Sequence, residues 1–147
     1  MSDTSPTTGP APEVRLHIAE YLMADLTSER WHCRDCDRDL GSVHDDYKRG
    51  LLIRERDPAE VHPAGLEGTY TFAPDGEWIR ILEFICPGCG RQVETEYLPP
   101  GHPITRDTEI DIASIKSRLA AGEVEIDRNG KLVAIPGKGA RPQEGAR

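Results

Sequence analysis

The sequence predicts a mostly β protein with one short helix. Apolar and polar residues alternate in several short segments, which is the period of strands with one buried face. Two Cys-x-x-Cys pairs, Cys33/Cys36 and Cys86/Cys89, lie beside such segments, and a stretch around residue 115 has the spacing of an amphipathic helix. At 147 residues the chain has room for one domain and not for two of full size.

Composition limits both the core and the classes of partner. Hydrophobic residues make up 37% of the chain and charged residues 30%, so the core is small and a cross-link would help to stabilise it. The formal net charge of -8 argues against nucleic-acid binding, because contacts with phosphate need surplus positive charge. No apolar run approaches the ~20 residues that span a bilayer, and the first residues lack the apolar stretch of a signal peptide. We therefore expect a cytoplasmic protein with no membrane partner.

The N-terminal part begins with a segment, 1–12, whose Ser, Thr, Gly and Pro content predicts a disordered leader. Alternation over 14–18 predicts a strand, with a helical stripe through Ile18, Leu22 and Leu26 as the alternative.

Residues 40–66 follow a predicted strand at Trp31 and are crowded with charges around Leu51–Ile53. We interpret them as a solvated loop with a short apolar anchor, and a partner-binding segment is the alternative. Pro58 and Pro63 argue against a long helix there.

Residues 67–98 are expected to form antiparallel strands at Thr69–Phe72, Glu77–Ile85 and Gln92–Leu98. The sequence Pro74-Asp75-Gly76 predicts a turn, because proline fixes φ and glycine permits positive φ.

A proline-rich break at 99–103 separates these strands from the predicted helix. Asp111 is the expected N-cap and Gly122 the expected stop. Three apolar residues lie on one face of this predicted helix: Ile112, Ile115 and Leu119.

The C-terminal part is predicted to be a β-hairpin over 123–135, because Asn129-Gly130 between alternating segments is a strong hairpin signal. Residues 136–147 return to Pro, Gly and charge and predict a flexible tail. The formal charge is +4 from residue 128 onward and -12 before it, so the tail is either a solubilising segment or a contact for an acidic partner.

The four cysteines, Cys33, Cys36, Cys86 and Cys89, match the requirements of a tetrahedral thiolate site for zinc. The x-x spacing lets each short turn aim two sulfurs at one ion, although Asp37 stands where the second turn has the more permissive Gly90. A redox pair, an iron–sulfur cluster and unliganded thiols are the alternatives. His32 and His44 flank the first pair; we expect solvated histidines or histidines that contact the ligands, and replacement of a cysteine ligand is the alternative.

Four thiolates would close the metal's coordination shell, so we expect one structural zinc per chain and no catalytic residue. The gap of 49 residues between Cys36 and Cys86 is long for a zinc module. The expected organisation is therefore a zinc-ribbon-like antiparallel β domain over 13–122 with a long insertion, followed by the hairpin and tail, with flexible termini.

Five motifs of the sequence are distinctive in combination: Ile18-Ala-Glu-Tyr-Leu22, Cys33-Arg-Asp-Cys36 with Asp39-Leu-Gly41, Gly50-Leu-Leu-Ile-Arg-Glu-Arg-Asp57, Leu82-Glu-Phe-Ile-Cys-Pro-Gly-Cys-Gly90 and Tyr97-Leu-Pro-Pro-Gly-His-Pro-Ile104. Through these motifs the chain resembles the small gamma subunit of the acetone carboxylase family, over about residues 14–120. The cysteine motif of the fourth segment is generic, whereas its combination with the fifth is more specific.

The resemblance implies a zinc-carrying accessory subunit of an ATP-dependent, biotin-independent ketone carboxylase, a hetero-oligomer. In such complexes the chemistry, with ATP and a divalent metal, resides in large hydantoinase-like subunits. The short length and the first Cys-x-x-Cys pair favour the acetophenone carboxylase branch, which makes benzoylacetate, over the acetone branch.

Two further residue sets are candidates for function. Exposed apolar residues on the predicted 77–85 strand, among them Trp78 and Phe84, would form an interface with partner subunits. His102 lies in a Pro- and Gly-rich turn and is either a functional residue or a histidine bonded to backbone. A free-standing zinc-ribbon adaptor and a small metalloenzyme are the competing functions.

Overall fold

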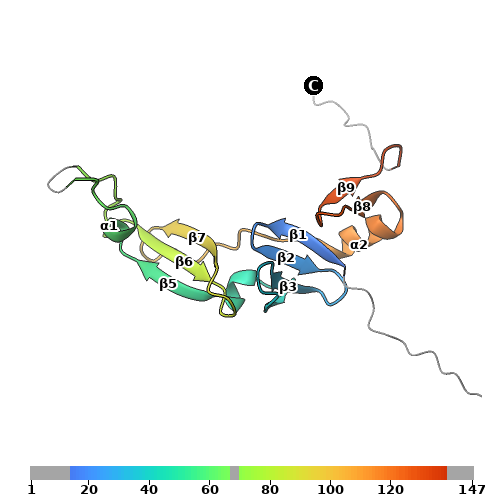
Figure 1. Ribbon diagram of the computed structural model, residues 1–147, viewed down its shortest axis with the longest axis horizontal. Helices are drawn as coiled ribbons and strands as arrows, with labels where there is room; N and C mark the ends of the chain where they lie inside the picture. The colour runs from blue at the N-terminus through green and yellow to red at the C-terminus, as the bar shows by residue number, and fades with distance from the viewer. Residues whose placement is uncertain (1–13, 67–69, 139–147) are drawn as a thin grey trace, which may run out of the picture.

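The computed structural model describes residues 14–66 and 70–138. The regular secondary structure of these residues is mostly antiparallel β-sheet, with one helix longer than a single turn, so the predicted fold class is confirmed. The molecule is elongated, with two sheets side by side and a small hairpin at one end (Figure 1). The predicted leader and residues 139–147 of the predicted tail lie outside the described residues.

The first sheet is a four-stranded antiparallel meander in the order β1-β2-β3-β4. Its strands are β1 (Arg15–Ala19), β2 (Leu22–Asp25), β3 (Arg30–Cys33) and β4 (Asp39–Ser42). The predicted first strand is confirmed, and the alternative helical stripe is wrong. Leu22 and Ala24 are buried with strand spacing, and β2 pairs with both β1 and β3.

The second sheet has three antiparallel strands in the order β5-β6-β7. A 3₁₀ turn, η1 (Tyr47–Gly50), leads into β5 (Leu52–Arg56), and the one-turn helix α1 (Pro58–Val61) follows. The central strand β6 (Arg80–Ile85) pairs with β5 and with β7 (Gln92–Leu98), so four of its six residues are buried. The prediction for β7 is confirmed to the residue.

Three predictions in this region are wrong. Residues 40–66 are not a loop, because they contain most of β4 and all of η1, β5 and α1. The expected strand at 69–72 is absent over its described residues 70–72, and β6 begins at Arg80 rather than at Glu77. The predicted turn delays β6, because the Asp75 carbonyl accepts from the N–H groups of Trp78 and Ile79.

Strand β5 could not be predicted from the sequence, because its charged residues interrupt the alternation of apolar and polar residues that is typical of a strand. All residues of β5 are exposed or half-buried, so buried and exposed side chains do not alternate along this strand. Its arginines instead pair with a carboxylate on the neighbouring strand: Arg54 donates to Glu83 at 2.6 and 2.8 Å, and Arg56 at 3.2 Å. An edge strand held by ion pairs and ladder hydrogen bonds carries no apolar alternation.

The C-terminal predictions are confirmed where the structure describes them. Helix α2 (Ile112–Ala120) is capped by Asp111, whose side chain accepts from the Ser114 N–H at 2.9 Å, and Gly122 stops it at φ 70°. Strands β8 (Val124–Ile126) and β9 (Leu132–Ala134) form the predicted hairpin. Its turn touches the first sheet through a bond from the His17 N–H to the Gly130 carbonyl at 2.7 Å.

One apolar core joins both sheets and α2. Its members come from β1–β4, from η1, from β6 and β7, and from the start of α2, where Ile112 is buried. Within the residues the structure describes, we find no helix with the length and apolar character needed to cross a membrane.

Candidate metal centre

The two cysteine pairs occupy turns with the same backbone hydrogen bonds. In each turn the N–H of the first cysteine donates to the carbonyl five residues later, and its own carbonyl accepts from the N–H four residues later. The four bonds are Cys33 to Arg38 at 2.9 Å, Asp37 to Cys33 at 2.9 Å, Cys86 to Arg91 at 2.8 Å and Gly90 to Cys86 at 2.9 Å. The first turn joins β3 to β4 and the second joins β6 to β7, so one comes from each sheet.

The position that closes each turn needs a left-handed backbone. Asp37 has φ 65° and Gly90 has φ 73°. Aspartate is among the few residues with a side chain that adopt this region readily. Its carboxylate also pairs with the Arg15 guanidinium. The sequence comparison of Asp37 with Gly90 therefore identified equivalent positions, and Asp37 forms the same turn.

The four sulfurs converge between the sheets. All four Sγ atoms lie within 4.8 Å of one another, and no disulfide joins them. The short separations cross from one turn to the other, at 3.8 Å for Cys33 and Cys89 and 3.6 Å for Cys36 and Cys86. A tetrahedral zinc with Zn–S bonds of about 2.3 Å has sulfur–sulfur edges of about 3.8 Å. The donor set and its spacing therefore fit zinc.

Backbone amides around the sulfurs favour thiolates. Burial raises the pKa of Cys33, while the N–H groups of Asp35 and Cys36 oppose that rise. Burial acts the same way on Cys86, but hydrogen bonds from the Cys89 and Gly88 amides and from neighbouring thiols leave its pKa lowered. Such N–H to sulfur bonds stabilise negative charge that a divalent cation would share.

Contacts outside the sulfurs also fasten one turn to the other. Arg91 of the second turn pairs with Asp35 of the first at 3.1 Å, and its guanidinium lies 4.8 Å from the centre of the Tyr21 ring. Gly88 is so close to the first turn that an added Cβ would lie 3.0 Å from the Cys36 sulfur. Glycine is required here for close approach, not for a positive φ.

The two flanking histidines do not join the sulfurs. The His32 Nδ1 lies 3.1 Å from the Asp37 carbonyl, and the His44 Nε2 lies 3.6 Å from a Glu29 carboxylate oxygen. In the described part of the chain, the cluster with metal-ligand geometry consists of cysteines alone.

Comparison with known proteins identifies the family. The sequence model described as the acetone carboxylase gamma subunit matches residues 11–120. The chain belongs to this family. One relative, the acetophenone carboxylase beta subunit of Aromatoleum aromaticum, is 56% identical over 118 residues, which is 80% of this chain and 91% of the relative. The resemblance seen in the sequence is thus confirmed, and this carboxylase small subunit contributes a four-cysteine cluster compatible with a metal.

Sequence reasoning missed a buried cation in this carboxylase subunit. Lys48, on η1, is 3% exposed, and its Nζ contacts Glu96 at 2.7 Å, the Thr105 carbonyl at 2.8 Å and Asp107 at 3.1 Å. The ammonium also lies 5.1 Å from the centre of the Phe84 ring. In the sequence Lys48 stands in a charged stretch, and nothing local marks it as buried, because its partners are about fifty residues away.

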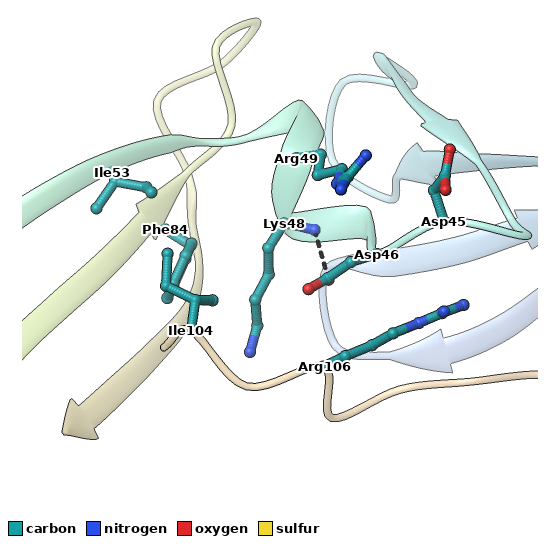
Figure 2. A pocket seen from close by; sticks show the side chains of 8 residues that line it. All are labelled: Asp45, Asp46, Lys48, Arg49, Ile53, Phe84, Ile104 and Arg106. Carbon is teal, nitrogen blue, oxygen red and sulfur yellow. Dashed lines mark hydrogen bonds between the residues drawn. The ribbon is translucent and has the colours of Figure 1, made fainter. Parts of the chain in front are cut away.

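Lys48 forms one wall of an open hollow of about 420 Å³ between the two sheets. Figure 2 shows Ile53, Phe84 and Ile104 together on one side of the lysine, with Asp45 and Arg106 on the other. Arg106 is itself engaged, because it pairs with Glu109 at 3.2 Å and donates to the His44 carbonyl at 3.0 Å. Through its contacts with Glu96, Thr105 and Asp107, Lys48 links η1 to β7 and to the segment that follows β7.

His102 lies away from the cysteines in an exposed turn. Its Nδ1 is 2.7 Å from the Pro103 carbonyl, and its N–H donates to the Pro99 carbonyl at 3.1 Å. These bonds are those of a turn histidine bonded to backbone.

Proposed function

We propose that this chain is the zinc-binding structural subunit of an ATP-dependent ketone carboxylase whose substrate is acetophenone. The observation that carries the proposal is the 56% identity to an acetophenone carboxylase beta subunit over 91% of that relative. An alignment over 118 residues, 80% of this chain, is too long to rest on one motif.

The zinc would be held by Cys33, Cys36, Cys86 and Cys89, two from each sheet. Four thiolates leave no coordination position for water or substrate, so the metal supplies a cross-link rather than Lewis-acid chemistry. The chain's own residues prepare the site: turn amides face the sulfurs, and Arg91 with Asp35 holds the turns together. This assignment makes the chain non-catalytic.

Catalysis would then belong to large hydantoinase-like partners in a hetero-oligomer. Those subunits would bind ATP and a divalent metal, and the complex would join bicarbonate to acetophenone to give benzoylacetate. Support comes from this sequence, which contains no phosphate-binding glycine loop and no recognised catalytic motif. We assign the subunit to the cytoplasm, because free thiols persist in a reducing compartment.

A second candidate is a subunit of an acetone-type carboxylase. The match to the acetone carboxylase gamma family model over residues 11–120 favours it. The two candidates share one architecture and differ in the ketone that the large subunits accept.

Reconstitution from purified subunits tests the proposal. We expect the zinc-loaded chain to bind the large carboxylase subunits of its own organism in fixed ratio. The complex should consume ATP and bicarbonate with acetophenone and not with acetone. Activity with acetone alone would favour the second candidate. A folded, zinc-loaded chain that does not bind these subunits would contradict both candidates and favour a free-standing adaptor.

A further inference from the structure

Three aromatic side chains stand almost fully in solvent. Tyr70 is 80% exposed, Phe72 89% and Trp78 73%, whereas Trp31 and Phe84 have no exposed surface. We call Tyr70, Phe72 and Trp78 the aromatic tip, because their segments lie beside the two ends of α1: the Thr71 hydroxyl donates to the His62 carbonyl, and Gly76, two residues before Trp78, lies against Pro58. Covering three such side chains would bury about 500 Å² of surface, more than half of what one partner contributes to a standard interface.

The aromatic tip is held in place by local bonds. The Tyr70 and Phe72 rings meet edge to face, with centroids 5.3 Å apart. Between them, the Thr71 hydroxyl donates to the His62 carbonyl at 3.1 Å. The Trp78 N–H donates to the Asp75 carbonyl at 3.0 Å. The two bonds hold the backbone near the aromatic residues, and the contact between the Tyr70 and Phe72 rings already restricts these two side chains, which lowers the entropy that they lose on binding.

The surroundings of the aromatic tip are acidic. The described residues between 54 and 83 include six carboxylates and three arginines. All three arginines pair within this segment, Arg54 and Arg56 with Glu83 and Arg80 with Glu55. Three carboxylates of the segment take part in none of the ion pairs found among the described residues: Asp57, Asp75 and Glu77.

The aromatic tip and the cysteine turn lie at opposite ends of one strand. Trp78 precedes the first residue of β6, and Cys86 follows its last. Six residues of strand span about 20 Å. Figure 1 shows α1 and the loop after it at one end of the molecule, far from the β8–β9 hairpin at the other. The cysteine cluster therefore fixes one end of a sheet whose other end presents the aromatic tip.

We propose that the aromatic tip docks into an apolar groove with a Lys- and Arg-rich rim on a large carboxylase subunit. This inference rests on the proposed function. Charge selects the occupant: a basic rim complements the unpaired carboxylates, whereas a second copy of this chain would bring two acidic surfaces together. Anionic lipid and nucleic acid would be repelled in the same way.

This placement refines the interface hypothesis drawn from the sequence. Trp78 is exposed and belongs to the docking surface. Phe84, the second residue of that hypothesis, is fully buried beside Lys48, so this part of the hypothesis is wrong.

The test measures binding of the zinc-loaded full chain to the purified large subunits. We expect the double variant Phe72→Ser/Trp78→Ser to bind at least 100-fold more weakly than wild type. Leu52→Ser is the matched control, because Leu52 is an exposed apolar residue, 58% exposed, at the other end of the same sheet. It should bind within threefold of wild type, and all variants should keep the wild-type zinc content and melting temperature.

A second, electrostatic variant tests the basic rim. Glu77→Lys should associate about tenfold more slowly at low salt, and its association should depend less on salt. Wild-type binding by the Phe72→Ser/Trp78→Ser variant, or equal weakening by Leu52→Ser, would overturn the docking inference and leave the proposed function standing. Failure of the wild-type chain to bind the large subunits would overturn the proposed function, and with it the docking inference.

Discussion

The two ends of the β5–β7 sheet differ in what their side chains contact. At the cysteine end, two turns from different sheets face one another, with four thiols, an Arg91–Asp35 pair and a glycine in tight contact. At the aromatic end, apolar side chains project into solvent, and three nearby carboxylates, those of Asp57, Asp75 and Glu77, take part in no ion pair among the described residues. The side chains at the cysteine end stabilise the fold, whereas the exposed aromatic side chains at the other end contribute little to its stability.

Because of this difference, we expect residues at the cysteine end to govern the stability of the chain and residues at the aromatic end to govern its binding to partner subunits. Changes at the cysteine end should lower the free energy of unfolding, whereas matched changes at the aromatic end should leave it unchanged. The following predictions test that separation, from the largest expected effect to the smallest.

Replacing a buried ligand should have the largest effect. Cys86→Ser removes one of four thiolates and is expected to reduce zinc affinity strongly and to cost more than about 4 kcal/mol of stability. Calorimetry of the purified chain measures this change. Phe72→Ser is the control at the aromatic end and should leave the melting temperature within about 2 °C of wild type. Equal losses in the two variants would contradict the separation.

Removing the buried cation should have the next largest effect. Lys48→Met leaves Glu96 and Asp107 without their shared ammonium, and an uncompensated buried charge costs about 3–5 kcal/mol. Chemical denaturation measures the loss. The double variant Lys48→Met/Glu96→Gln should recover part of it, because one of the uncompensated carboxylates is then neutral.

The same ion pair gives a pH dependence with a definite sign. Burial alone would lower the pKa of Lys48, but the hydrogen bonds that its ammonium donates to the Glu96 and Asp107 carboxylates, and their negative charges, outweigh burial and leave the pKa raised. A raised lysine pKa stabilises the fold fully below the ordinary value of 10.5. That stability is lost as pH rises through the folded-state pKa. The stability difference between wild type and Lys48→Met should therefore be constant from pH 6 to 9 and should shrink only above the ordinary lysine pKa.

Two glycines test the contact between the turns. Gly88→Ala places a Cβ 3.0 Å from the Cys36 sulfur and 3.3 Å from the Arg38 Cβ, so the turns must move apart. We expect a loss of about 1–3 kcal/mol and weaker zinc binding in a competition titration. Gly76, near the aromatic tip, is the control, because its added Cβ would meet only the Pro58 Cδ at an ordinary 3.7 Å. A comparable loss in Gly76→Ala would contradict the interpretation.

The equivalent closing positions of the two turns should show the smallest effect. Gly90→Ala forces a Cβ into the left-handed region at φ 73° and should cost about 1 kcal/mol. Asp37→Gly relieves a similar backbone cost at φ 65° but removes the pair with Arg15, so its net change should stay within about 0.5 kcal/mol. Thermal melts of the two variants compare the turns directly. A larger loss for Asp37→Gly would show that the Arg15 pair, not backbone conformation, governs the first turn.

Local signals in the sequence were sufficient for the elements that carry them. The spacing of Cys33, Cys36, Cys86 and Cys89 predicts the cluster, because two Cys-x-x-Cys pairs supply the four sulfurs of a tetrahedral zinc site. The Asp111 cap and Asn129-Gly130 turn act through their own backbone, so the sequence places α2 and the last hairpin correctly.

Elements that depend on distant partners were not predictable in this way. The charges of β5 find their partner on β6, and the burial of Lys48 depends on Glu96 and Asp107, so the local composition of both predicts solvent. Conversely, the aromatic residues at 70–72 have strand propensity, yet Tyr70 and Phe72 pair with each other instead of joining a sheet. Strand propensity is a property of the single residue, whereas the contacts that a residue makes depend on the whole fold.

X-ray absorption at the zinc edge of the purified chain, with metal content measured on the same sample, tests the central claim most directly. We expect one zinc per chain with four sulfur neighbours at about 2.3 Å and no nitrogen or oxygen neighbour. A chain that folds with the same melting temperature without metal, or a zinc bound by fewer than four sulfurs, would contradict the assignment of a closed structural site between the two sheets.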